Sequence, residues 1–116
     1  TVTTLGALDQ GLARFDAEQL DGYALAADRV SALAARLQGL DYDAIRALPQ
    51  VNQQRADLIT AGALILDTAL ARWGHAAIRV STRGLRYGLL LRALGLLPDG
   101  AASVAGLEPA FGPPLA

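Results

Sequence analysis

The stretch NQQRADLITAGALILDTALARW, residues 52–73, decides the fold of this chain. We expect one long helix here, because apolar side chains recur at helical spacing until Gly74 ends the pattern. A helix that is apolar nearly all round is buried on several sides. Gly62 lies near its centre, where glycine costs about 1 kcal/mol relative to alanine. Close approach of another backbone or of a ligand would explain that glycine. The apolar side chains are Leu58, Ile59, Leu64, Ile65, Leu66, Leu70 and Trp73.

On the N-terminal side of this stretch the pattern predicts more helices. Apolar residues three and four apart predict helices over residues 1–15 and 28–37. A short helix over residues 41–48 has Asp41 as its N-cap and ends before Pro49. We expect residues 16–22 to form a loop and residues 22–25 a short extended piece.

On the C-terminal side, alternation predicts a strand over residues 77–81, with Ile78 and Val80 on one face. We expect a helix over residues 85–94 that turns Leu85, Leu89, Leu90 and Leu94 inward. Residues 98–116 are rich in Gly and Pro, which is typical of a flexible tail. One strand cannot satisfy its own backbone groups. With Thr1 rather than Met at its start, the chain is expected to be a piece of something larger or to pair with another chain.

The composition of the chain limits the classes of partner and of binding site that we expect. The chain has ten basic residues, all Arg, and eleven acidic ones. Its net charge is therefore near zero and does not point to nucleic acid or to a membrane surface as a partner. The chain has no Cys, which excludes disulfides and thiolate sites and fits the cytoplasm. No apolar run reaches the roughly 18 residues that span a bilayer, and no signal peptide is visible.

Four motifs in order resemble the exopolyphosphatase/guanosine-pentaphosphate phosphatase (Ppx/GppA) family. Residues 55–66 resemble its R-A-D-x-I-x-x-G-A-x-I-L helix, and residues 78–90 resemble its I-x-V-S-x-x-G-L-R-E-G-L-L strand and helix. Residues 1–8 resemble the segment after the Gly-Gly of its G-G-T-x-T-x-L-A loop. Residues 22–25 resemble its H-G-Y-x-L stretch, with Asp21 in place of the His. The resemblance runs from Thr1 to about Leu94.

The resemblance implies a fold that is mainly α with a short β element, part of an α/β actin-like (ribonuclease H-like) ATPase-fold lobe. Residues 1–97 would be the C-terminal part of the second lobe. The implied activity is release of terminal phosphate from inorganic polyphosphate or guanosine pentaphosphate, with Mg²⁺, in the bacterial cytoplasm. The family's general-base Glu and phosphate loops lie upstream of this stretch. The chain would therefore supply binding rather than catalytic groups, beside the remainder of the protein or a homodimer partner.

Arg55 is the first candidate for phosphate binding, because its planar fork donates two hydrogen bonds and a helix start favours anions. Thr1 and Thr3 follow the position of the phosphate-loop glycines, and Arg86 lies in the second motif. Tyr87 stands where the family usually has Glu. We expect no catalytic residue and no metal ligand in this chain, and His75 has no visible partner.

Other interpretations stay open. Arg55 would be structural if it pairs with Asp57 or Asp9, and the threonines if they only cap a helix. The run Arg79, Arg83, Arg86 and Arg92 fits a polyanion channel or a solvated edge. The whole chain fits a non-enzymatic helical interaction module derived from the same fold; the motif text argues against an actin-fold kinase lobe.

Overall fold

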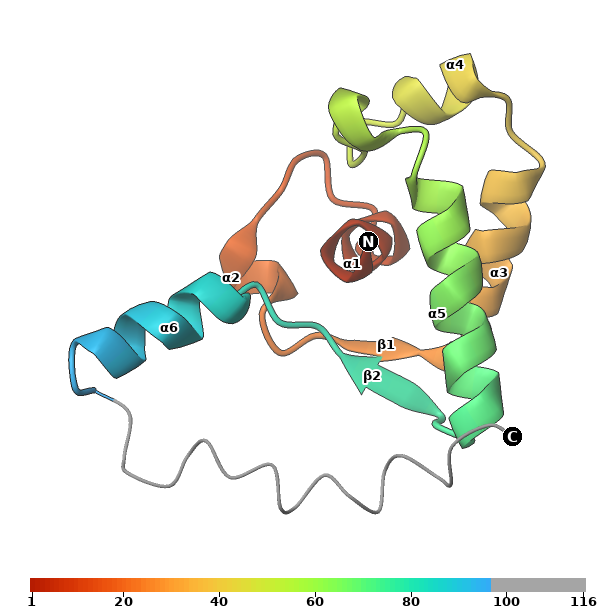
Figure 1. Ribbon diagram of the computed structural model, residues 1–116. Coiled ribbons are helices and arrows are strands. Elements are labelled where there is room, and N and C mark those ends of the chain that lie inside the picture. The colour runs from red at the N-terminus through yellow and green to blue at the C-terminus, as the bar shows by residue number, and fades with distance from the viewer. Residues whose placement is uncertain (97–116) are drawn as a thin grey trace. The chain divides into compact units, whose positions relative to one another are not determined.

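The computed structural model describes residues 1–96, which form two compact units that we treat separately. The first unit is Thr1–Thr82 and the second begins at Arg83. The first unit contains five α-helices, a short 3₁₀ helix and two strands (Figure 1). In chain order these are α1 (Val2–Gln10), α2 (Ala17–Leu20), β1 (Ala24–Ala26), α3 (Ala27–Gln38), α4 (Tyr42–Arg46), η1 (Gln53–Arg55), α5 (Ile59–Trp73) and β2 (Ala77–Arg79).

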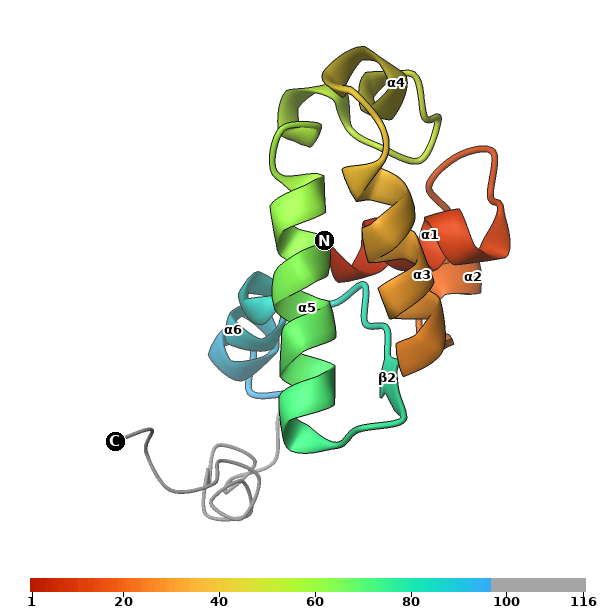
Figure 2. The same ribbon diagram turned by 90° about the vertical axis from the view of Figure 1, so that its right-hand side faces the viewer.

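The centre of the first unit is the pair α3 and α5, which run side by side in opposite directions (Figures 1 and 2). Helix α3 keeps the predicted 3.6-residue period and ends at Gly39 as expected. Its buried residues are Val30, Leu33, Ala34 and Leu37, and those of α5 are Ile59, Ala63 and Leu70. Ser31 of α3 also donates a hydrogen bond to Asp67 of α5. Apolar surface that is removed from water stabilises this helix pair by about 25 cal/mol per Å².

Helix α1 packs on α3 and is shorter than the predicted helix over residues 1–15. Gly11 adopts the left-handed conformation (φ 65°) and its N–H donates to Ala7 and Leu8 carbonyls, which ends the helix. The predicted loop over residues 16–22 contains α2 instead. The Asp16 side chain accepts from the N–H groups of Glu18 and Gln19 and so caps that helix.

The two strands pair antiparallel, with Leu25 opposite Ile78 and Ala24 opposite Arg79. Strand β2 is two residues shorter than predicted, but its sidedness is confirmed, because Val80 is buried while Arg79 and Ser81 are exposed. The predicted extended piece at residues 22–25 is its partner. The sheet of the first unit therefore consists of two three-residue strands.

Helix α5 differs from the prediction in two ways. It begins at Ile59 rather than at residue 52, because Asn52 caps the separate helix η1 through a 2.9 Å bond to the Gln54 N–H. It is also buried on one side only among the described residues, since Leu58 beside it and Ile65 within it are 61% and 70% exposed. Upstream, Asp41 caps α4 as predicted, accepting from the Ala44 N–H at 2.8 Å.

The second unit, as far as it is described, is helix α6 (Leu85–Ala93). The prediction that its leucines turn inward is wrong for the described part of the chain. Leu85, Leu89, Leu90 and Leu94 are all exposed. The predicted tail over residues 98–116 lies outside the described residues. Within residues 1–96, none of the helices combines the length and apolar character that crossing a membrane requires.

Candidate phosphate-binding pocket

A pocket of about 1060 Å³ opens on the first unit and brings together three of the four predicted site residues, Thr1, Thr3 and Arg55. Among the described residues, Arg55 is the one charged side chain of the lining, and none of the lining residues carries a carboxylate. Its polar character comes from hydroxyl and amide groups. Such a set suits an anion better than a cation, because every group can donate a hydrogen bond. The other lining residues are Thr4, Phe15, Pro49, Gln50, Val51, Asn52, Gln53, Gln54, Leu58 and Ile59.

Thr1 stands at the N-cap position of α1 but makes no capping hydrogen bond with its side chain. Simple capping therefore does not explain Thr1. Instead, its side chain packs against the backbone of Gly62 in α5. A Cβ on Gly62 would lie 2.8 Å from Thr1 Cγ2 and closer still to its Oγ1. The close approach expected at Gly62 is thus made by Thr1, and glycine leaves the space that positions this hydroxyl at the pocket.

Arg55 lies at the end of η1, not at the start of a long helix as predicted. Its carbonyl accepts from the Leu58 N–H at 3.0 Å, which fixes the backbone in a turn before α5. The side chain is exposed, and within residues 1–96 it makes no hydrogen bond or ion pair. Arg55 and Thr1 both line the pocket. Burial and the nearby positive charge of Arg55 lower the pKa of the Thr1 α-amino group.

Two rim segments of the pocket are tied together. The Gln50 side chain donates to the Leu12 carbonyl at 2.5 Å, joining the α1–α2 loop to the segment after α4. Phe15, in that loop, lines the pocket with 63% of its surface exposed. Sequence reasoning missed both residues. It placed Phe15 inside a helix, and no pattern marks a glutamine that bridges two loops 38 residues apart.

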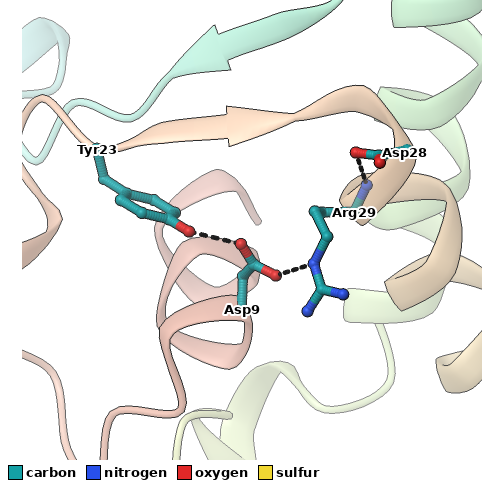
Figure 3. Close-up of polar contacts among 4 residues, drawn as sticks. All are labelled: Asp9, Tyr23, Asp28 and Arg29. Carbon is teal, nitrogen blue, oxygen red and sulfur yellow. Dashed lines mark hydrogen bonds and ion pairs between the residues drawn. The ribbon is translucent and has the colours of Figure 1, made fainter.

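A polar cluster that sequence reasoning also missed links Asp9 of α1 to Tyr23, just before β1, and to Arg29 of α3 (Figure 3). The Asp9 side chain, which is 6% exposed, accepts 2.6 Å bonds from the Tyr23 hydroxyl and from Nε of Arg29. Burial by itself would raise the pKa of Asp9. The hydrogen bonds from Tyr23 and Arg29, with the Arg29 charge, outweigh it, so the pKa lies below its ordinary value. The bond to Asp9 raises the pKa of Tyr23. Asp9 thus pairs with Arg29, and the proposed Arg55–Asp9 pair is wrong.

The remaining candidates lie elsewhere. Arg86 is on α6 in the second unit, with an exposed side chain. In the same unit Arg83 stacks over the Tyr87 ring, 5.2 Å from its centroid. Arg79 is engaged with the Gly22 carbonyl at 3.4 Å. His75 is exposed in the turn after α5.

The described residues also bear on the divalent cation that the resemblance implies. Across residues 1–96, no three His, Asp or Glu side chains gather closely enough to hold a metal ion. The described pocket lining offers hydroxyls, amides and one guanidinium, whereas proteins usually hold Mg²⁺ through one or two carboxylates together with water and substrate phosphates. The described residues therefore do not fit a metal centre of their own.

Comparison with known proteins adds the family. The profile of the Ppx/GppA phosphatase family matches residues 1–97. Two similar solved structures are crystal structures of the Aquifex aeolicus Ppx/GppA family member and of the type II variant of the Aquifex aeolicus Ppx/GppA phosphatase. Each is 26% identical in sequence to this chain, and their TM-scores are 0.76 and 0.74. The alignments cover 80% and 78% of this chain and 31% of each of those chains. None of the curated proteins compared with the chain matches it. The chain belongs to the Ppx/GppA phosphatase family.

Proposed function

We propose that this chain forms the phosphate-binding part of a phosphoanhydride hydrolase. Its pocket would hold terminal phosphates of inorganic polyphosphate or guanosine pentaphosphate, and groups outside the described residues would activate the attacking water. In this proposal residues 1–97 are the C-terminal part of the second lobe of an actin-like fold, and residues 98–116 are a tail. A bacterial cytoplasmic enzyme that uses Mg²⁺ and assembles with further chain or a second copy fits the family.

The observation that carries the proposal is that Arg55, Thr1 and Thr3 line one pocket, to which the described residues contribute no carboxylate. A guanidinium donates two hydrogen bonds to phosphate oxygens at once, and hydroxyl groups can donate further hydrogen bonds to the remaining oxygen lone pairs. Charge-assisted bonds of this kind contribute about 1.5–3 kcal/mol each. Within residues 1–96 no acidic side chain pairs with Arg55, so its charge is available to an anion.

The first test of this proposal is binding of inorganic tripolyphosphate to the 116-residue chain, measured by titration calorimetry. Arg55→Ala should weaken binding at least tenfold, the lower end of one charge-assisted bond. The matched control is Arg72→Ala, which removes the same charge from an exposed position of α5 outside the pocket. Equal affinity for both variants would sink the assignment of Arg55.

The division between binding and catalysis has its own test. Phosphate release from polyphosphate by this chain alone should be undetectable in the presence of Mg²⁺. Robust metal-dependent release would contradict the proposal that catalytic groups lie elsewhere, whatever the binding results.

The second candidate, a non-enzymatic interaction module, is favoured by the apolar side chains exposed along α5. Leu58, Leu64 and Ile65 together present a surface that the described residues leave uncovered. A chain that binds no tripolyphosphate but forms stable dimers in analytical ultracentrifugation would favour this candidate over the hydrolase.

A further inference from the structure

The candidate pocket lies between two segments that are far apart in the sequence. The first wall, residues 1–15, is α1 with the loop after it and contributes Thr1 and Thr3 to the lining. The second wall, residues 49–59, runs from behind α4 to the start of α5 and contributes Arg55. An anion held by all three side chains must contact both walls at once, so the separation of the walls decides whether the three can reach it.

Apolar packing and a hydrogen bond join these two walls. Leu8 of the first wall and Val51 of the second belong to one buried core. Apolar packing is not directional, so it holds the walls together without setting their separation closely. Within residues 1–96, the hydrogen bond that crosses from one wall to the other is donated by the Gln50 side chain to the Leu12 carbonyl, at 2.5 Å. Because a hydrogen bond depends on both distance and angle, this bond can fix the separation.

Both ends of the bond between Gln50 and Leu12 are anchored. Leu12 lies just past the end of α1, where its N–H donates to the Ala7 carbonyl at 3.0 Å. On the other wall, the Val51 N–H donates to the Leu48 carbonyl at 3.0 Å, and the Val51 side chain is buried. The bond therefore joins two fixed points of the backbone, and its loss would free one wall to move relative to the other.

We propose that Gln50 is a positioning residue of this pocket. Its bond holds the two walls at the separation at which Arg55 on one wall and Thr1 and Thr3 on the other reach the same anion. The inference rests on the proposed phosphate function and adds a residue that serves it through the backbone, because the Gln50 amide is engaged with Leu12. Walls that are already held in place lose less conformational freedom when the ligand enters, which strengthens binding.

The experiment replaces Gln50 by methionine, which has a similar length but cannot donate a hydrogen bond. Titration calorimetry with inorganic tripolyphosphate should show binding about 3- to 10-fold weaker than in the unmodified chain, the range expected for one hydrogen bond. The matched control is Gln10→Met, which should leave the affinity unchanged. Gln10 is also half-buried and donates its side-chain amide to the Gln19 carbonyl at 3.1 Å, but it lies outside the pocket lining. If Gln50→Met does not fold, Gln50→Asn, whose amide is one methylene too short to reach Leu12, makes the same comparison.

Gln50→Glu provides a rescue that a purely structural role would not show. Near pH 7 its carboxylate cannot donate to the Leu12 carbonyl, and its charge repels the anion, so binding should be weaker than in Gln50→Met. Near pH 4, below the ordinary glutamic acid pKa of about 4.3, most of the carboxyl is protonated and its O–H can donate again. Its affinity relative to the unmodified chain at the same pH should then exceed that of Gln50→Met, whereas removal of the charge alone would make the two variants equal.

The outcomes separate the positioning role from the phosphate function. The positioning role is wrong, while the phosphate function stands, if Gln50→Met binds tripolyphosphate as tightly as the unmodified chain or if Gln10→Met weakens binding equally. It is also wrong if Gln50→Glu shows no advantage over Gln50→Met near pH 4. If the unmodified chain binds no tripolyphosphate, the phosphate function itself fails, and the positioning role fails with it.

Discussion

The two faces of α5 differ in what covers them. One face buries Ile59, Ala63 and Leu70 against the rest of the first unit, where α3 packs alongside. The other exposes Leu64 and Ile65, which are as apolar as the buried set. Hydrophobicity therefore marks a face for contact but does not say which partner supplies that contact. For α5, the described residues supply only α3 and its neighbours.

Of the substitutions considered, Leu70→Ala should lower the free energy of unfolding most strongly. It removes a side chain that is 4% exposed and leaves a cavity, at a cost of about 3 kcal/mol. The same change at Ile65, 70% exposed, should cost about 0.5 kcal/mol or less. Urea denaturation followed by circular dichroism gives both values. If Leu70→Ala does not fold, Ile59→Val tests the same face at about 1 kcal/mol. Similar costs at Leu70 and Ile65 would mean that both faces are covered.

The next prediction concerns Asp9 of α1, whose carboxylate is bonded to Tyr23 and to Arg29 of α3, and the change tested is Asp9→Asn. It weakens the bonds to Tyr23 and Arg29 and should cost about 1–2 kcal/mol near neutral pH, since Arg29 is more than half exposed. The pKa of Asp9 is lowered in the folded chain, so its stabilisation is complete above the unfolded value, about 3.9. It is lost as pH falls through the folded pKa.

The free energy of unfolding of the unmodified chain should therefore fall more steeply below about pH 4 than that of Asp9→Asn. Urea titrations at several pH values measure both slopes. Parallel curves would mean that the Asp9 carboxylate contributes no pH dependence, contrary to the expectation from its bonds to Tyr23 and Arg29. Tyr23→Phe, which removes one donor and leaves the carboxylate with Arg29, should keep part of the slope.

Gly62→Ala should have a small effect on stability and a clear effect on binding. Its Cβ would displace the Thr1 side chain, while alanine favours the helix by about 1 kcal/mol, so the net change should stay within about 1 kcal/mol. Loss of the Thr1 hydroxyl from the pocket should weaken tripolyphosphate binding about 3- to 10-fold. Ala61→Gly, the exposed neighbour, should cost about 1 kcal/mol and leave the affinity unchanged. A Gly62→Ala variant with full affinity would remove Thr1 from the site.

Much of the first unit was predictable because its signals are local. The period of α3, the cap at Asp41 and the glycine after Trp73 each specify an element through neighbouring residues. The predictions failed where one residue outweighed a longer pattern. Gly11 ends α1 although apolar spacing continues to Leu12, and the Asn52 cap separates η1 from α5.

Three residues that line the candidate pocket were named from the sequence, and for a different reason. Arg55, Thr1 and Thr3 came from the family resemblance, and the pocket that contains all three was not visible in any local pattern. Phe15 and Gln50 were missed because their roles depend on two loops meeting in space. Pairings between distant loops leave no periodic signal in a sequence.

The sheet has a consequence for how the first unit holds together. Strand β1 leads directly into α3 and β2 follows α5, so residues 27–76 lie between the paired strands. Closing so long a segment costs entropy that two three-residue strands do not repay by themselves. The antiparallel helices meet that requirement by bringing the strand ends together. Amide hydrogen exchange at the paired strands is therefore a direct reporter of whether α3 and α5 remain docked.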